Sequence, residues 1–370
     1  MPRNYRFIER RPREMRLRRP LLDALLREHP RRFDIVPRLG RNTYQVTPGD
    51  WIGTIDCGGA KFEVAPKIRG CNWSHLLNIG DAVPQPGGAI WPSLVEALGQ
   101  GLLARLRHLR HQGGDRVYHE AASVSAYLRG RLDIAAQMRS TQPLPEFHCH
   151  VDQLGYDPAF YAQVRETWER LGIIGGLSAG CSAAIEELLP AAPLQPVAVA
   201  APLRREPALD ELHDWLAYIN ECLFDGVHLR IDTPRLFEHY MGRELSRLAP
   251  DARWRLQPMH RIRSTADAAT LTLQPDIVLE RTDGSRVILD VKWKRLGETP
   301  LADDVQQVLA YALVFDATDM GLIYPGPRDE MRSYPMLGGR ELRLYQVRVT
   351  GAASACQRGI RRLVRAIRCN

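Results

Sequence analysis

The sequence feature that most constrains the fold is an Asp-Gly pair, Asp283-Gly284, between two apolar runs at 275–280 and 287–294. Both runs are rich in Val, Ile and Leu. Asp-Gly between two such runs is typical of a tight β-hairpin turn. We therefore expect two antiparallel strands that meet at this turn.

The segments around the hairpin extend it into an α/β domain of about 150 residues. Asp232, Thr233 and Pro234 combine an N-cap with a first-turn proline, which predicts a helix that ends near Leu248. The basic C-terminal tail has the spacing of an amphipathic helix. The other predicted elements are a strand at 269–273, a helix at 301–317, and strands at 320–324 and 342–349.

The N-terminal half has a different pattern. Short alternating segments at 43–46, 51–56 and 61–65 predict a small β-sheet, and helical patterns follow at 92–111 and 157–172. The fold class is therefore α/β, or α+β over the whole chain. We expect a basic, partly helical arm at 1–32, an N-terminal domain at 33–150, a helical connector and proline-rich linker at 151–207, and a second domain at 208–370.

Charge is concentrated at the two ends of the 370-residue chain, whose net charge is +7. Residues 1–32 hold eleven Arg and four acids, and residues 358–370 hold five Arg and no acid. Such ends favour contact with phosphate or with an anionic partner, although they could equally serve solubility. The four lysines, at 61, 67, 292 and 294, do not follow glycine, which excludes a phosphate-binding P-loop.

Cysteine usage and hydropathy exclude further classes. The seven cysteines are scattered without a Cys-x-x-Cys pair, so the pattern signals neither a disulfide framework nor a structural zinc site. No stretch has the roughly 18 uncharged apolar residues of a membrane span. The N-terminal residues lack the apolar core of a signal peptide. We expect a cytoplasmic protein with no membrane contact.

The second strand of the hairpin carries the residues that suggest catalysis. Period-two alternation places Asp290 and Lys292 side by side on one face, and Asp276 lies on the partner strand. Two converging carboxylates favour Mg²⁺, or Mn²⁺ in its place, with the carbonyl of Val291 as a further ligand. A lysine beside such a site can stabilise charge on a reacting phosphate. The alternative is an ordinary surface ion pair.

Two helices could complete this site. Asp304, Gln307 and Tyr311 follow helical spacing, so they share one stripe, while Val305, Val308, Leu309 and Ala312 are expected on the opposite face. Glu238, near the start of the helix that follows Asp232, is a third acid that could reach the metal, or a glutamate that merely favours the helix N-terminus.

Several segments resemble one protein family. PDIVL at 275–279, VILDVKWK at 287–294, DDVQQVLAYA at 303–312 and GLIYP at 321–325 resemble a PD-(D/E)xK restriction-endonuclease-like core, in the form found in McrC. GDWIGTIDCGGAKFEVAPKI at 49–68 and YLRGRLDI at 127–134 also resemble McrC segments. McrC is the nuclease subunit of McrBC-type, modification-dependent restriction systems.

The resemblance implies roles for individual residues. Asp276 and Asp290 correspond to metal-binding acids, Lys292 to the catalytic lysine and Gln307 to the helix glutamine, and Glu238 corresponds to a helix glutamate. Gln306 stands where the family often has Tyr, and Trp293 where it commonly has Tyr.

The resemblance also implies a partner and a substrate. McrC-type proteins act with a hexameric AAA+ GTPase, McrB, which recognises modified cytosine, and their N-terminal region stimulates its GTP hydrolysis. We therefore expect a Mg²⁺-dependent endonuclease that cuts foreign modified double-stranded DNA, with residues 33–150 as the partner-docking domain. Two alternatives remain: a stand-alone nuclease of DNA repair or junction resolution, and a non-catalytic activator of a ring NTPase.

Overall fold

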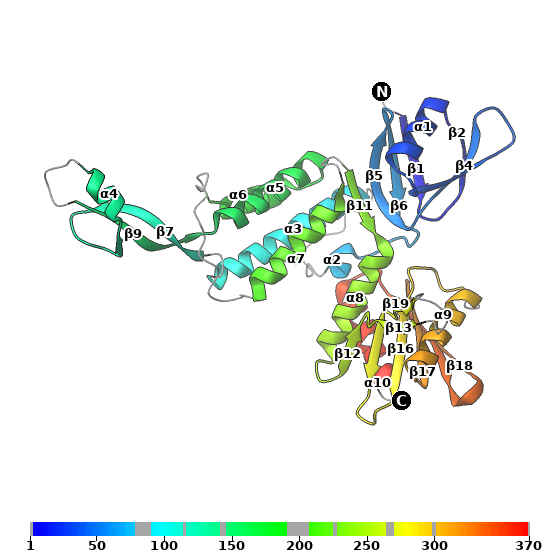
Figure 1. Cartoon of the computed structure of the whole chain (residues 1–370). Coiled ribbons are helices and arrows are strands. Elements are labelled where there is room, and N and C mark those ends of the chain that lie inside the picture. The colour runs from blue at the N-terminus through cyan, green and yellow to red at the C-terminus, as the bar shows by residue number, and fades with distance from the viewer. Residues whose placement is uncertain are drawn as a thin grey trace. The chain divides into compact units, whose positions relative to one another are not determined.

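The computed structural model describes residues 3–77, 90–113, 116–140, 146–190, 207–224, 228–263, 270–297 and 301–368 (Figure 1). The chain divides into two compact units, one made of residues 1–90 with 228–370 and the other of 91–227. The boundaries expected from sequence, at 32, 150 and 207, differ from this division. Positions 191–206 of the expected linker lie outside the described residues.

The N-terminal part of the first unit contains two sheets. In one, β1 (Arg3–Ile8) pairs in parallel with β6 (Ala60–Ala65), and β5 (Trp51–Cys57) lies antiparallel between β6 and β11 (His228–Asp232). In the other, β4 (Thr43–Pro48) pairs with β2 (Arg13–Arg16) and β3 (Phe33–Pro37). Helix α1 (Arg19–Glu28) packs against β5.

The arm expected at 1–32 is therefore an integral part of this fold. Phe7 of β1 and Leu22 and Leu25 of α1 are buried in one core with Trp51 and Phe62. The apolar residues of this segment are interspersed with arginines that remain at the surface. A count of charges alone therefore did not indicate that the segment contributes to a core. The parallel pairing of β1 with β6 joins distant segments, and no local sequence signal indicates it.

A glycine permits strand β11, which follows position 227, to pair with the N-terminal sheet. Gly53 of β5 has φ +151°, and a Cβ atom there would lie 2.0 Å from the carbonyl oxygen of Leu229 in β11. Only glycine permits so close an approach of two backbones. This pairing ties 228–232 to the N-terminal sheets, which is why the observed division differs from the expected one.

The C-terminal part of the first unit is a mixed sheet in the order β12-β15-β16-β17-β19-β18. The predicted hairpin is confirmed, because Ile277 pairs with Leu289 and Glu280 with Arg286. Strands β16, β17 and β19 run in parallel, and the other neighbours are antiparallel. The strands are β12 (Arg253–Leu256), β15 (Ile277–Glu280), β16 (Arg286–Val291), β17 (Asp319–Gly326), β18 (Glu330–Pro335) and β19 (Glu341–Arg348).

Three details of this sheet differ from the sequence prediction. Strand β16 ends at Val291 rather than at 294. The segment expected at 269–273 forms β14 (Thr270–Leu273), which pairs with β13 (His260–Arg263) in a separate two-stranded sheet. Strand β18 was not expected, because it is an edge strand with many polar residues. A short 3-10 turn, Leu337–Gly339, separates β18 from β19.

Helices cover both faces of the mixed sheet. Helix α9 (Ala302–Val314) packs on the face that carries Ile288 and Leu344, and α10 (Ala353–Arg368) packs on the face that carries Tyr345. Helix α8 (Thr233–Leu248), capped by Asp232 as predicted, contacts β16, α10 and the short helix α2 (Trp73–Leu76). These layers confirm the α/β fold class.

The second unit joins helices to a long β-hairpin. Helices α3 and α7 pack closely, because Gly101 leaves room for the ring of Trp215 and Arg105 stacks on that ring. Helix α5 begins after the Asp157 cap as predicted but continues past Gly172 to Ile174. The helices are α3 (Ile90–His111), α4 (Ile134–Arg139), α5 (Pro158–Ile174), α6 (Ala179–Leu188) and α7 (Pro207–Cys222), and the strands are β7 (Arg116–Ser125), β8 (Arg131–Leu132), β9 (Phe147–Tyr156) and β10 (Leu223–Phe224).

The hairpin of β7 and β9 extends away from these helices and carries α4 at its far end (Figure 1). Throughout the described part of the chain, no helix has both the length and the apolar character that crossing a membrane requires.

Candidate functional site

Two aspartates meet at the end of the C-terminal hairpin. Asp290 is the penultimate residue of β16 and is only 2 % exposed. Asp276 directly precedes β15, and its Oδ2 accepts a hydrogen bond of 2.7 Å from the backbone N–H of Val291. Because β15 and β16 are antiparallel and Ile277 pairs with Leu289, Asp276 and Asp290 lie at neighbouring strand ends.

Lys292 lies beside this acid pair and links it to helix α9. Its Nζ is 2.6 Å from Asp290 Oδ2 and donates a hydrogen bond of 2.8 Å to Gln307 Oε1. Gln307 Nε2 in turn donates to the hydroxyl of Tyr311 at 2.9 Å. Four residues singled out from the sequence, Asp276, Asp290, Lys292 and Gln307, are therefore brought together.

A second set of contacts links the segment after Lys292 to helix α9. Lys294 Nζ lies 2.8 Å from Asp304 Oδ1, and the Tyr324 hydroxyl donates to Asp304 Oδ2 at 3.2 Å. Asp304 and Tyr311 are buried together with Val308. The expectation that the polar stripe of this helix lies opposite its apolar stripe is therefore wrong, because Asp304 and Gln307 contact the two lysines that follow β16.

Burial and mutual repulsion perturb the two carboxyl groups. Burial, followed by the charge of Asp290, raises the pKa of Asp276 to about 7. Burial also raises the pKa of Asp290, against the opposing effect of Lys292. Burial by itself would lower the pKa of Lys292, but the charge and hydrogen bond of Asp290 and the charges of Asp276 and Asp304 together raise it, so the ammonium is favoured. Without a cation, the folded chain therefore disfavours ionisation of both carboxyl groups at once.

Glu238 lies near the acid pair but does not form a compact group with it. Burial, and then the charges of Asp232 and Asp290, raise its pKa. It is half-buried on α8. Glu238, Asp276 and Asp290 do not form a set of three whose carboxylate oxygens all lie within 4.8 Å of one another among the described residues. Its role as a metal ligand stays a prediction, as does that of the Val291 carbonyl.

The acid pair has the properties of a divalent-cation site. Asp290 Oδ2 is buried and receives no hydrogen bond of good geometry from the described residues, although Lys292 Nζ is near it. Carboxylate oxygens are the ligands that Mg²⁺ prefers, and Mn²⁺ accepts the same set. The donors that are present therefore fit the predicted cation.

A pocket of about 500 Å³ opens beside these residues. Its wall is shared between the C-terminal core and the N-terminal sheets, both within the first unit. Six basic and three acidic side chains line it, so it favours an anionic ligand such as a phosphodiester backbone. The lining residues are Glu9, Arg10, Arg11, Asp50, Lys67, Pro234, Glu238, Val291, Lys292, Trp293, Lys294 and Arg295.

A buried glutamate next to this pocket was missed by sequence reasoning. Glu9 is fully buried, and its carboxylate accepts hydrogen bonds from Thr233 Oγ1 at 2.6 Å and Trp293 Nε1 at 3.0 Å. Lys67 Nζ lies 3.3 Å from Glu9 and 3.2 Å from Asp50. Lys67 belongs to the Pro-Lys-Ile segment noted above, which could have drawn attention to it; nothing local distinguishes Glu9 from other acids among arginines.

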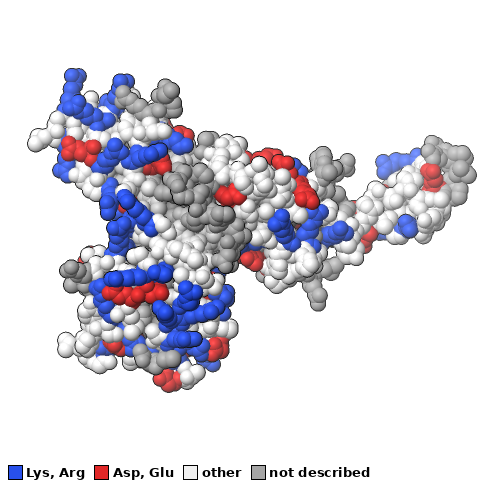
Figure 2. All heavy atoms as spheres, turned by 180° about the vertical axis from the view of Figure 1, so that it is seen from behind, with Lys and Arg blue, Asp and Glu red and all other residues white. Residues whose placement is uncertain are grey.

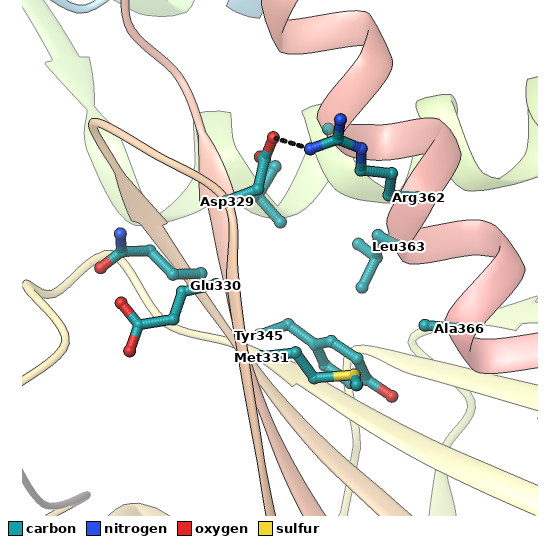
Figure 3. Close-up of a pocket in the computed structure, with 10 residues that line it drawn as sticks. Asp329, Glu330, Met331, Tyr345, Arg362, Leu363 and Ala366 are labelled. Carbon is teal, nitrogen blue, oxygen red and sulfur yellow. Dashed lines mark ion pairs between the residues drawn. The ribbon is translucent and has the colours of Figure 1, made fainter.

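Helix α10 confirms the predicted amphipathic tail. It buries Ile360, Leu363 and Ile367, while its five arginines are exposed. Figure 2 shows many Lys and Arg side chains, with some acids among them, over the C-terminal part of the chain at the foot of the view. One smaller pocket beside α10, of about 250 Å³, contains the ion pair of Asp329 with Arg362 above Met331 and Tyr345 (Figure 3). It includes none of the predicted site residues.

One family model matches part of the chain. Residues 226–325 match the family model described as McrBC 5-methylcytosine restriction system component. This range contains Glu238, the acid pair, Lys292 and Gln307. No curated protein matches the chain.

The fold also matches solved structures. A chain in a half-complex of Thermococcus gammatolerans McrB AAA+ hexamers with bound McrC is 18 % identical, with a TM-score of 0.58, and the match covers 98 % of this chain and 100 % of that one. A second match, to the McrBC complex of the same organism, is 16 % identical, covers 68 % of this chain and 89 % of the other, and has a TM-score of 0.41. The first of these likenesses shows that the fold is shared.

Proposed function

We propose that this chain is an McrC-type protein, the Mg²⁺-dependent DNA endonuclease subunit of a McrBC-type restriction system; the match of residues 226–325 to the McrBC family model and the shared fold support this. In the cytoplasm it would cut foreign DNA that carries 5-methylcytosine or a similar modified base. The observation that carries this proposal is the buried Asp276–Asp290 pair beside Lys292, at a pocket whose lining is predominantly basic.

The side chains divide the work of phosphodiester hydrolysis. Asp276 and Asp290 would hold Mg²⁺, which when bound polarises a phosphate and lowers the pKa of a bound water. Lys292 is held between Asp290 and Gln307, where its ammonium can stabilise negative charge that develops on the phosphate. Arg11 and Arg295, across the same pocket, can position the DNA backbone.

The partner in this proposal is a hexameric AAA+ GTPase, as in the solved McrB assembly that the fold matches. Nucleotide hydrolysis would belong to that partner, because none of the four lysines here lies in a P-loop. The far end of the β7–β9 hairpin offers a docking surface, since a group of apolar side chains is exposed there. They are Tyr127, Leu128, Leu132, Ile134 and Met138. We propose that this surface mediates stimulation of GTP hydrolysis.

The decisive experiment measures cleavage of methylated DNA by the complete complex with Mg²⁺ and GTP. Asp290→Asn and Lys292→Ala should each reduce the cleavage rate by about 100-fold or more. Asp303→Asn is the matched control, because Asp303 is an exposed acid in the first turn of α9. The partner's GTP hydrolysis should be unchanged in all three variants.

The outcomes separate this proposal from its alternatives. If Asp290→Asn cleaved DNA at the wild-type rate, the acid pair would not be the active site. Cleavage by the purified chain alone, without GTP, would favour a stand-alone nuclease. Stimulation of GTP hydrolysis without any binding of Mg²⁺ or Mn²⁺ in calorimetry would favour a non-catalytic activator.

A further inference from the structure

A second group of metal-ligating side chains lies in the N-terminal sheets, away from the carboxylate pair. One ligand atom from each of Glu28, His29 and Cys57 lies within 4.8 Å of the other two. Within the described ranges, this is the one set of three or more His, Cys, Asp or Glu residues that meets this distance. It includes neither Asp276 nor Asp290 and plays no part in the proposed cleavage.

The fold brings these residues together from two elements. Glu28 is the last residue of α1, and His29 is its C-cap. Cys57 is the last residue of β5, the strand against which α1 packs. Leu22 and Leu25 of α1 are buried in the same core as Cys57, so packing holds the helix end beside the strand end.

The burial of the three residues suits a bound ion. Cys57 is 2 % exposed and His29 is 8 % exposed, so the thiol and the ring are shielded from bulk water. The Glu28 side chain is 42 % exposed and lies at the surface. An ion can therefore enter past Glu28 and be held by the two buried groups.

The chemistry of the ligands selects the metal. A thiolate, an imidazole and a carboxylate are the three ligand types of protein-bound zinc, at about 2.0–2.3 Å from the ion. Tetrahedral ligands at these distances lie roughly 3.3–3.8 Å apart, which small side-chain rotations reach from separations within 4.8 Å. Mg²⁺ and Ca²⁺ prefer oxygen ligands alone, so this group discriminates against the cation of the carboxylate pair.

We propose that Glu28, His29 and Cys57 bind one Zn²⁺ ion, with water as the fourth ligand. The ion clamps the C-terminal end of α1 to the end of β5. Its role is to stabilise the N-terminal sheets, so the proposal does not depend on the nuclease assignment.

His228 is the adjacent histidine, and it is not counted as a ligand. Its ring centroid lies 6.2 Å from that of His29. Its Nδ1 accepts a hydrogen bond of 3.2 Å from the backbone N–H of Asp56, so the neutral ring carries its proton on Nε2. That nitrogen can donate a hydrogen bond but has no lone pair for the metal.

The sequence pattern pointed away from zinc because the chain has no Cys-x-x-Cys pair. The ligands here are an adjacent Glu-His pair and a cysteine in another element, a spacing with no recognised motif. Only the packing of α1 on β5 brings them together.

The experiment measures metal content of the full chain, purified without chelator, by inductively coupled plasma mass spectrometry. We expect about one zinc per chain, which remains after dialysis against Mg²⁺. Cys57→Ser and His29→Gln should lose the zinc. Cys149→Ser is the control, because Cys149 is equally buried but lies in the second unit, and it should keep the zinc.

A spectroscopic measurement protects the test against variants that fold poorly. Co²⁺ added to metal-free wild-type chain should give a thiolate-to-cobalt charge-transfer band, which Cys57→Ser lacks and Cys149→Ser retains. Metal-free chain should also melt at a lower temperature than zinc-loaded chain. A wild-type chain that contains no zinc and gives no cobalt–thiolate band would overturn the proposal, leaving only the hydrogen bond between Cys57 and Glu28.

Discussion

Trp293 Nε1 donates a hydrogen bond of 3.0 Å to Glu9 Oε2, although 284 positions separate the two residues. Trp293 directly follows Lys292, and Glu9 follows the first strand of the chain. The same carboxylate accepts from Thr233, which begins the helix that carries Glu238. Glu9, a buried acid that follows β1, therefore contacts two of the chain segments that supply the candidate active site.

Replacing Glu9 should be costly. In Glu9→Ala, the indole N–H of Trp293 and the hydroxyl of Thr233 lose their acceptor, and Lys67 loses one of its two acidic neighbours. Removal of one partner from a buried ion pair costs about 3–5 kcal/mol of unfolding free energy. Urea denaturation measures this loss. Glu14→Ala, at an exposed position of β2, should change the unfolding free energy by less than about 0.5 kcal/mol.

The activity of Glu9→Gln separates positioning from simple stability. The amide oxygen can still accept from Trp293 and Thr233, so this variant should keep most of the cleavage rate while losing the ion pair with Lys67. If Glu9→Ala were as stable as Glu14→Ala, the network would not contribute to the fold.

The acid pair with Lys292 and the buried Glu9 differ in how far the sequence could predict them. The Asp276–Asp290–Lys292 arrangement follows from a hairpin whose turn and strand periodicity are local signals, and the structure brings these residues together. Glu9 is one of several acids in an arginine-rich segment, and its burial results from parallel pairing of β1 with β6. Long-range pairing and the packing of helices on strands leave no local pattern, so Glu9 and the Glu28–His29–Cys57 group became visible only in the fold.

The raised pKa of Asp276 predicts a pH-dependent stability in the absence of divalent cations. Its pKa is about 7 in the folded chain, against an ordinary value of 3.8 for an aspartate exposed to water. The folded state therefore favours the protonated form, so the stabilisation is complete below about pH 4 and is lost as pH rises toward 7. The loss amounts to about 1.4 kcal/mol for each pKa unit of difference, shared with Asp290.

The measurement is urea denaturation in EDTA at several pH values between about 5 and 8. The decline in unfolding free energy should be shallower in Asp276→Asn, whose side chain does not titrate. Mg²⁺ should stabilise the wild-type chain most at the upper end of this range, where both carboxylates are ionised. Equal slopes for wild type and Asp276→Asn would contradict the assignment of this titration to Asp276.

Gln307 and Gln306 form a natural matched pair on α9. Gln307 accepts the hydrogen bond from Lys292 Nζ, and Gln306 is an exposed neighbour. Gln307→Ala should leave Lys292 less well oriented and reduce cleavage by about 10-fold or more, mainly in kcat. Gln306→Ala should cleave like wild type. Equal rates for the two variants would show that Gln307 does not position the lysine.

The far end of the β7–β9 hairpin supplies the last prediction. Tyr127 is 59 % exposed and Met138 is 82 % exposed, so replacing either removes no core packing. If this surface docks on the GTPase ring, Tyr127→Ala should weaken the complex by about 1–3 kcal/mol, roughly 5-fold to 150-fold in affinity. Stimulated GTP hydrolysis measured against chain concentration reports this change.

Leu39→Ser is the control for that measurement. Leu39 is fully exposed between β3 and β4 in the first unit, so this variant matches the loss of exposed apolar surface at a different place. It should stimulate the GTPase like wild type. The Tyr127→Ala chain should also reach the wild-type maximal stimulation once its concentration is raised, because docking is weakened while the nuclease core is untouched. A half-maximal concentration that is the same for Tyr127→Ala and Leu39→Ser would place the partner contact elsewhere on the chain.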